Sequence, residues 1–372
     1  EQAYVLEFGA NYIRFYKDGG ILTEATTAIT AATKANPVVV TAASHGLSNG
    51  DRVFIGSVTG MTQLNNREFT VANKTTNTFE LSGIDGTGFD TYSSGGTVGK
   101  IVEVTTTYSV TEIFELNHVQ SADVLFIAHK DHEPAKLTRT TATSFTLADI
   151  DFIDGPYLDE NTTTTTIYAS ANTGSGITLT ASASVFASAD VGRLVRLREV
   201  IEVQHDAWTA STSYAQNDLV RFGDNVYKKT DSGSDTSGAT PPVHLSGSET
   251  YGAITWEFQH SGSGFLEITG FTSATQVTAT FKNSTGVLPA SVVGSGTPTT
   301  RWSLGAFGGD EKFPKAVAFY EERLYFAGTT GQPQTIFGSK SADFENHTPG
   351  TADDDAINIT IASDRVNVIK HL

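Results

Sequence analysis

The chain has 372 residues, which is long enough for two or three domains with a substantial core. It contains no cysteine, which excludes disulfides, thiol chemistry and thiolate metal sites. Its formal net charge of −17 argues against a DNA-binding surface, because binding to phosphates needs Lys and Arg to displace counterions. The acidic charge either keeps a large assembly protein in solution or lines a channel that a duplex crosses without sticking.

The spacing of the apolar residues predicts an all-β fold. They recur mostly at period two, and β-branched residues dominate the runs. No run approaches the roughly 18 apolar residues of a membrane span and no signal peptide is visible, so we expect no membrane insertion. Strand-like runs stand at both ends, residues 3–9 and 366–372, and we expect their partner strands to lie outside this chain.

The first hundred residues predict a meander followed by a small module. Residues 4–23 read as three strands with turns at 9–11 and 17–20, and the Ala/Thr-rich residues 24–36 read as a linker. Short strands separated by Gly, Asn and Asp turns then close a small barrel or sandwich; we expect them at 38–41, 52–55, 68–73 and 78–82.

The sequence HGLSNGDRV at residues 45–53 resembles a small β-barrel module that recurs in phage tail proteins. It is similar to the FCCH domain of ubiquitin-activating enzymes. The resemblance implies a fold and no ubiquitin chemistry, because the module carries no catalytic group.

The pattern of this module returns later in the chain. Residues 177–199, ITLTASASVFASADVGRLVRLRE, echo residues 38–56, and residues 264–281 echo residues 67–83. We therefore expect two copies of one barrel module, the second split by an insertion between about His205 and His260.

The inserted segment has the aromatic order of a sugar-binding module. Its Trp208, Tyr214, Tyr227 and Trp256, with Asp218-Leu219-Val220 and Pro241-Pro242, resemble the small chitin- and cellulose-binding modules of carbohydrate-binding type 5/12. The resemblance implies that these four rings stack on sugars. A module of about fifty residues has little core, however, and some of the rings must form it.

These patterns predict a propeller-like body with inserted small β-barrel modules. The expected division is body strands at 1–28, an FCCH-like module at 29–100, a body blade at 101–160, a second barrel module at 161–204 and 261–302, a carbohydrate-binding-like insertion at 205–260, and a body blade at 303–372.

Two clusters contain metal-capable side chains, and we expect no metal at either. In His129-Lys130-Asp131-His132-Glu133 a hairpin tip can bring the two histidines together, but the spacing matches no established zinc pattern. Asp353-Asp354-Asp355 lacks the spacing, Gly and Glu of an EF-hand, and an acidic loop facing solvent or a channel is favoured over an irregular calcium site.

No catalytic constellation or cofactor motif stands out, so we expect no enzyme and no cofactor. The carboxylates Asp149, Asp151 and Asp154, or Glu321 and Glu322, are abundant without evident placement for glycoside hydrolysis. Neither a Gly-x-Ser-x-Gly elbow nor a phosphate-binding glycine loop occurs.

Two further phrases carry a more specific resemblance. Residues 316–347, AVAFYEERLYFAGTTGQPQTIFGSKSADFENH, with the following DDDAINITIASDRVNVIKHL, resemble the tail tubular protein B family, the nozzle proteins of short-tailed bacteriophages. Residues 120–157 resemble an earlier blade of the same proteins. Together they cover about a quarter of the chain.

The resemblance implies a structural protein of the virion tail. It implies a homohexameric ring, contact with a tail adaptor protein and with tail fibres, and a lumen through which double-stranded DNA passes without specific binding. The alternative is a virion-borne or secreted carbohydrate-binding protein or polysaccharide depolymerase, with a cell-surface polysaccharide as partner. A third, weaker interpretation is an adhesin built from β-modules.

Overall fold

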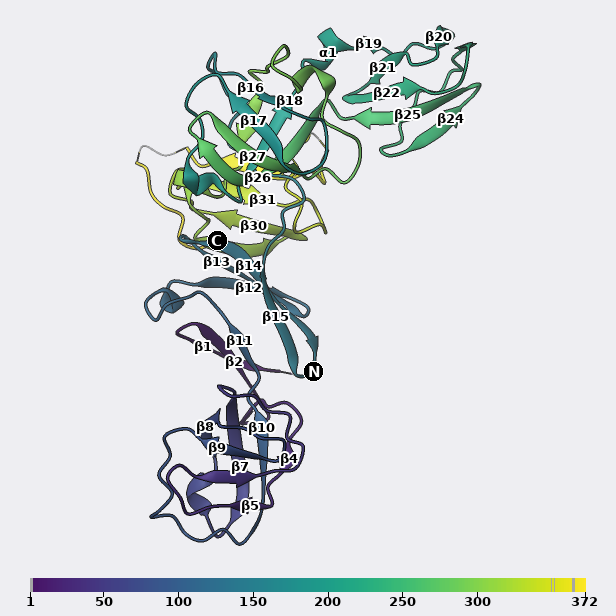
Figure 1. Ribbon diagram of the computed structural model, residues 1–372. Helices are drawn as coiled ribbons and strands as arrows, with labels where there is room; N and C mark the ends of the chain where they lie inside the picture. Colours follow the sequence, from purple (N-terminus) through teal and green to yellow (C-terminus); the bar gives the residue numbers. More distant parts are fainter. Residues whose placement is uncertain (1–2, 349, 351, 363–364) are drawn as a thin grey trace. The chain divides into compact units, whose positions relative to one another are not determined.

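The computed structural model describes residues 3–348, 350, 352–362 and 365–372. Over these residues the protein is all-β, as predicted (Figure 1). The described helical elements are one four-residue α-helical turn and five 3-10 turns: α1 (Ile201–Gln204), η1 (Thr62–Leu64), η2 (Glu112–Phe114), η3 (Ser188–Asp190), η4 (Ala290–Val292) and η5 (Gly309–Glu311). Among the described helices, none has the length and apolar character to cross a membrane.

The chain forms two compact units. The first consists of Glu1–Leu116, Gln120–Phe126 and Ala135–Ala148. The second consists of Asn117–Val119, Ile127–Pro134 and Asp149–Leu372.

The first unit begins with a small antiparallel sheet into which a module is inserted. Its strands are β1 (Val5–Gly9), β2 (Tyr12–Lys17), β3 (Gly20–Ile21) and β11 (Glu103–Thr105). β2 pairs with both β1 and β11, and Thr23 bridges Ile101. The chain therefore leaves this sheet and returns to a neighbouring position, which defines the intervening residues as an insertion.

The inserted module is a seven-stranded sheet in the order β4-β10-β7-β8-β9-β6-β5. Its strands are β4 (Thr27–Ala28), β5 (Ala31–Ala32), β6 (Val39–Thr41), β7 (Arg52–Thr59), β8 (Arg67–Ala72), β9 (Thr78–Leu81) and β10 (Ser94–Lys100). Alternate residues such as Val53 and Ile55 are fully buried, as period-two patterning requires. β10 was not predicted from the sequence, because its sequence SGGTVGK begins with a run of small, turn-forming residues.

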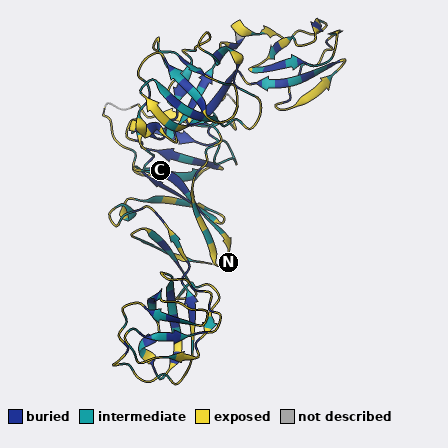
Figure 2. Cartoon of the chain, in the orientation of Figure 1, coloured by how far each residue is buried: buried dark blue, intermediate teal, exposed yellow. Residues whose placement is uncertain are grey.

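The second unit contains a sheet with the same strand order. Its strands are β16 (Ile167–Ala169), β17 (Ile177–Ala181), β18 (Leu194–Arg198), β26 (Ser263–Ser273), β27 (Gln276–Phe281) and β28 (Trp302–Leu304). The order β16-β17-β27-β26-β18-β28 repeats β5-β6-β9-β8-β7-β10 strand for strand. The sequence echo thus corresponds to an equal topology around a separate apolar core, coloured dark blue in Figure 2.

A further sheet is inserted between β18 and β26. These two strands pair directly, with Leu194 opposite Glu267 and Arg198 opposite Ser263. The inserted sheet has the order β19-β21-β22-β25-β24, accompanied by the pair β20-β23. Its strands are β19 (Asp206–Ala207), β20 (Ser213–Ala215), β21 (Leu219–Phe222), β22 (Asn225–Lys229), β23 (Ser234–Thr236), β24 (Ser248–Tyr251) and β25 (Ile254–His260).

Two four-stranded sheets keep the order of the sequence, β12-β13-β14-β15 and β29-β30-β31-β32. The strands are β12 (Asn117–Ser121), β13 (Val124–His129), β14 (His132–Thr141), β15 (Ser144–Asp149), β29 (Ala316–Tyr320), β30 (Arg323–Ala327), β31 (Thr335–Gly338) and β32 (Ile357–Thr360). Four sequential strands are the size of one propeller blade. A closed propeller stays a prediction.

Candidate functional sites

Three of the four predicted sugar-stacking rings lie in the core of the inserted sheet. Tyr214, Tyr227 and Trp256 are 8%, 0% and 1% exposed, and they pack together with Val220 and Ile254. Stacking on a sugar needs an exposed ring face, so the assignment of these three residues is corrected: they stabilise the module. Burying them is what allows so short a segment to fold.

Trp208, the fourth predicted ring, packs at the edge of the same core and is partly exposed. It contacts Phe222 edge-to-face, with ring centroids 6.2 Å apart. Phe222 is 40% exposed and was not singled out from the sequence. Trp208 and Phe222 therefore form an aromatic pair of this sheet that keeps exposed ring surface.

The predicted acidic loop at Asp353–Asp355 is held by a buried arginine. Arg323, on β30, is 5% exposed and donates to the backbone carbonyls of Asp353 and Asp355. The Asp355 carboxylate pairs with Lys340 at 2.9 Å. Two carbonyl oxygens that a calcium ion could use therefore accept from a guanidinium, while the side chains of Asp353 and Asp354 are exposed.

The histidines of the HKDHEP hairpin do approach each other. His129 ends β13 and His132 begins β14, and their ring centroids are 5.1 Å apart. The Asp131 N–H donates to Nδ1 of His129 at 3.2 Å, which closes the tip of the hairpin. The expectation of no metal at this pair stays a prediction.

The carboxylates considered for glycoside hydrolysis are divided between two places. Asp154 is structural, because its carboxylate accepts from the Tyr157 hydroxyl at 2.5 Å and from Thr348 Oγ1 at 3.0 Å. Asp149 and Asp151 line a cavity of about 300 Å³ in the second unit. Glu133 and Glu267, from β14 and β26, line it as well.

The four carboxyl groups of this cavity have different electrostatic surroundings. Lys282 contacts Asp151 at 2.8 Å and Glu267 at 3.1 Å, so both of these have a cation partner. Desolvation raises the pKa of Glu133, and the nearby Asp149 and Glu267 charges add to this effect. Desolvation also raises the pKa of Asp149. A carboxyl group with a raised pKa beside ionised carboxylates is an arrangement that can supply a general acid.

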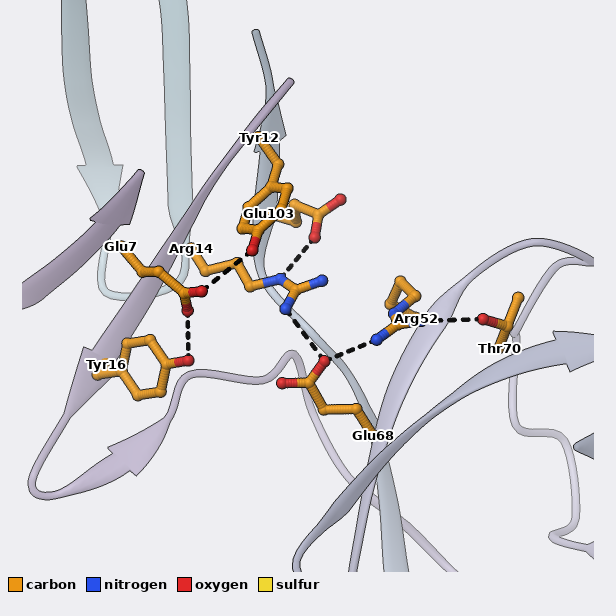
Figure 3. Close-up of polar contacts among 8 residues, drawn as sticks. All are labelled: Glu7, Tyr12, Arg14, Tyr16, Arg52, Glu68, Thr70 and Glu103. Atoms are coloured by element: carbon orange, nitrogen blue, oxygen red, sulfur yellow. Dashed lines mark hydrogen bonds and ion pairs between the residues drawn. The ribbon is translucent and has the colours of Figure 1, made fainter. Parts of the chain in front are cut away.

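In the first unit, a polar network joins the small sheet to the inserted module. Figure 3 shows Arg14 of β2 between two carboxylates: its Nε is 2.7 Å from Glu103 and its Nη1 is 3.0 Å from Glu68. Glu68 lies on β8 of the module and also pairs with Arg52 at 2.8 Å. The Arg14 side chain is only 11% exposed, so this ion pair is better shielded from solvent than a surface pair.

The same strand carries two tyrosines that share one carboxylate. Tyr16 donates to Glu7 at 2.5 Å and Tyr12 donates to it at 3.0 Å (Figure 3). The bond from Tyr16 lowers the pKa of Glu7, and the same bond raises the pKa of Tyr16 to about 12. These contacts are structural: they fix β1 on β2 beside the point where the module is inserted.

Comparison with known proteins supports the first barrel module. Residues 35–101 match the family model of the ubiquitin-activating enzyme E1 FCCH domain, within which β6 to β10 all fall. Among solved structures, the chain is similar to the phage phi92 endosialidase, at 12% identity and a TM-score of 0.19. That alignment covers 98% of this chain and 59% of the endosialidase. No curated protein matches the chain.

Proposed function

We propose that this protein is a structural component of a bacteriophage tail, a nozzle or tail tubular protein that forms part of the conduit for DNA ejection. The observation that carries the proposal is the sheet β29-β30-β31-β32. The phrase that resembles the nozzle family, residues 316–347, supplies three of its strands, and residues 357–360 supply the fourth. The second resembling phrase, residues 120–157, supplies β13, β14 and β15.

The mechanism would be mechanical and electrostatic. Copies of the chain would pack side by side around an axis, with an adaptor protein on one side of the ring and tail fibres outside it. A formal charge of −17 opposes phosphate binding, so duplex DNA would slide through the lumen rather than stick to it. The two inserted modules would face outward, because insertions into surface loops are tolerated and are free to meet partners.

Electron microscopy of the full-length protein, alone and mixed with the other tail proteins, tests this function. We expect a closed ring with a central hole wide enough for a DNA duplex, and with the β29–β32 sheet in its wall. The matching control is an electrophoretic binding assay at low salt, in which the ring should not retain duplex DNA.

A monomer or trimer that never joins the tail axis would contradict the nozzle assignment. The competing depolymerase assignment is favoured by the cavity that contains Glu133 and Asp149, because both have a raised pKa. If the protein does not join the tail axis and releases reducing sugar from capsular polysaccharide, it would be assigned to the depolymerases. Binding of the polysaccharide without release of reducing sugar would indicate a carbohydrate-binding protein instead, provided that a Phe222→Ala variant loses this binding and still folds.

A further inference from the structure

The two crossings between the second barrel module and its inserted sheet meet at three potential metal ligands. Glu199 follows β18, His205 follows α1, and His260 ends β25. One ligand atom from each of the three lies within 4.8 Å of the others. Glu199 and His205 are on the chain that enters the insertion and His260 is on the chain that leaves it, so the group stands at the neck of the inserted sheet.

The central carboxylate is buried without a full complement of partners. The Glu199 side chain is 1% exposed, and its Oε1 has no hydrogen-bond partner among the described residues. An ionised carboxylate oxygen removed from water is costly unless a cation or donors compensate it. Its nearest polar neighbours are His205 Nε2 at 3.3 Å and His260 Nδ1 at 3.5 Å.

The imidazole of His260 presents a lone pair at this point. Its Nδ1 accepts a long bond, 3.2 Å, from the Gly262 N–H, so this nitrogen carries no proton in the neutral ring. Burial, and then the neighbouring His205, lower the pKa of His260 to about 4, which agrees with a neutral ring near pH 7. Because a ring nitrogen has one lone pair, a metal ion bound between Nδ1 and the Glu199 carboxylate would take the place of this long bond from Gly262.

Two of the three ligand separations fit a small tetrahedral ion, and the third lies within 4.8 Å. Ligand atoms about 2.0–2.1 Å from a tetrahedral zinc ion are about 3.3–3.4 Å from one another. The separations of 3.3 and 3.5 Å from Glu199 Oε1 already match that spacing. Two histidines with one glutamate are a ligand set used by zinc, and imidazole nitrogen also suits nickel and cobalt.

Neighbouring contacts orient the carboxylate toward the histidines. Ser291 Oγ donates to Glu199 Oε2 at 2.6 Å, which leaves Oε1 as the oxygen that faces the two rings. The Glu199 backbone is fixed at both ends: its N–H donates to the Gly262 carbonyl at 3.0 Å, and its carbonyl accepts from Arg301 Nη1 at 2.8 Å. Such outer contacts are what hold metal ligands in position.

We propose that Glu199, His205 and His260 bind a divalent transition-metal ion of the zinc type, which pins the inserted sheet to the barrel module at its neck. All three residues also line a cavity of about 690 Å³. A fourth coordination position is therefore open to water or to a small ligand, so the ion is exchangeable rather than sealed in. Because the ligands belong to both crossings of the neck, binding stabilises the joint as well as each strand end.

The test is metal binding by the full chain, stripped with a chelator and titrated with Zn²⁺. We expect one equivalent to bind, a rise in the melting temperature that EDTA reverses, and slower proteolysis at the neck. Co²⁺ should give the strong visible absorption of a four-coordinate site. The variants His205→Gln and His260→Gln should each weaken binding about a hundredfold, and Ser291→Ala about tenfold through the loss of its outer contact.

Two controls separate this site from other histidines. His118→Gln removes an exposed histidine and should leave the affinity unchanged. His132→Gln removes one member of the other close pair and should also leave it unchanged. The chelator experiment on the unmodified chain does not depend on whether any variant folds.

Failure of the chelated chain to take up Zn²⁺ or Co²⁺ would overturn the proposal and leave the cluster as a joint of buried side chains. Equal affinity and stoichiometry in His205→Gln, His260→Gln and the unmodified chain would overturn it too. Neither result bears on the tail assignment, which the ring experiment tests separately.

Discussion

At the scale of single residues, buried histidines mark places where the fold and the charge state are coupled. In the second unit, His244, His260 and His347 are 8%, 7% and 2% exposed. His347 lies among aromatic rings, with centroids 5.5 Å from Phe152 and 6.1 Å from Phe326. Burial lowers its pKa from 6.5 to about 3, although the nearby backbone of Gly338 opposes part of that effect.

We expect His347 to make folding stability fall as the pH is lowered from about 6.5 toward 3. In this window the unfolded chain binds a proton at His347 and the folded chain does not, so the free energy of unfolding decreases. One such proton corresponds to about 1.4 kcal/mol per pH unit. His260 acts in the same direction, because its pKa is lowered to about 4.

Urea denaturation at several pH values measures this dependence. The variant His347→Phe keeps an aromatic ring at the site and should reduce the slope of stability against pH by about one proton, whereas the exposed-site control His118→Gln should not. A slope unchanged by His347→Phe would show that this ring does not titrate as its burial implies.

At the scale of the elements, the hairpin β29-β30 has unusual turn chemistry. Tyr320 pairs with Arg323, so Glu321 and Glu322 form a two-residue turn, and their φ angles are 45° and 59°. Positive φ at both central positions defines a type I′ turn, which favours Asn-Gly because residues with larger side chains are strained there. In the sequence this pair stands out only as two adjacent carboxylates, and the structure places both of them in the turn.

Replacing this pair by the preferred residues should stabilise the protein. We expect the double variant Glu321→Asn with Glu322→Gly to raise the free energy of unfolding by about 1 kcal/mol, because it relieves the strain at positive φ. The exposed Tyr320–Glu321 contact that is lost contributes little. Thermal or urea unfolding measures the gain.

The matched control is Glu24→Gly, at an exposed bend without positive φ, which should give no gain because glycine there only adds freedom to the unfolded chain. A double variant less stable than the unmodified chain would contradict the turn geometry.

At the scale of the whole molecule, the protein is assembled by insertion. One module is inserted between β3 and β11 of the first small sheet, and another sheet is inserted between β18 and β26 of the second barrel module. In both cases the chain returns beside its point of departure. A module whose ends are adjacent can be added without separating the strands that flank it.

We therefore expect residues 22–102 to fold when expressed alone. All of the buried apolar residues of this module's core come from between Ile29 and Val98, and the Thr23–Ile101 bridge holds its ends together. Circular dichroism and a dispersed amide NMR spectrum should show a cooperative β-fold. The peptide 206–260, with its much smaller core, is the comparison and should be less stable.

An excised module that unfolds non-cooperatively would indicate that it depends on the Arg14–Glu68 ion pair with the remainder of its unit. Restoring residues 3–105 would then recover folding, since this longer piece contains β1, β2 and β11.

Much of this architecture could be predicted from local patterns. The strands predicted at 38–41, 52–55, 68–73 and 78–82 correspond to β6, β7, β8 and β9. They could be predicted because apolar and polar residues alternate along a half-buried strand. The repeated module could be predicted for the same reason. Strand β10 could not be predicted, because Gly95 and Gly96 have no side chains to alternate and take positive φ.

The candidate sites were harder to predict, because burial depends on what packs against a side chain. The sequence shows that residues 227 and 256 are aromatic but not whether their rings are exposed. In the structure both Tyr227 and Trp256 are buried in the core of the sheet. The cluster of Glu199, His205 and His260 gave no motif, since its members come from separate elements that only strand pairing brings together. The nearest signal in the sequence was that His205 and His260 mark the borders of the insertion.

The sequence by itself determined the all-β class, the positions of most strands and turns, and the presence of a repeated module, because these depend on residues close together in the chain. The tertiary structure decided which rings form a core and that a carboxylate and two imidazoles meet at the neck. The reason is physical: alternation and turn chemistry are local, whereas burial and ligand geometry depend on how distant strands pair.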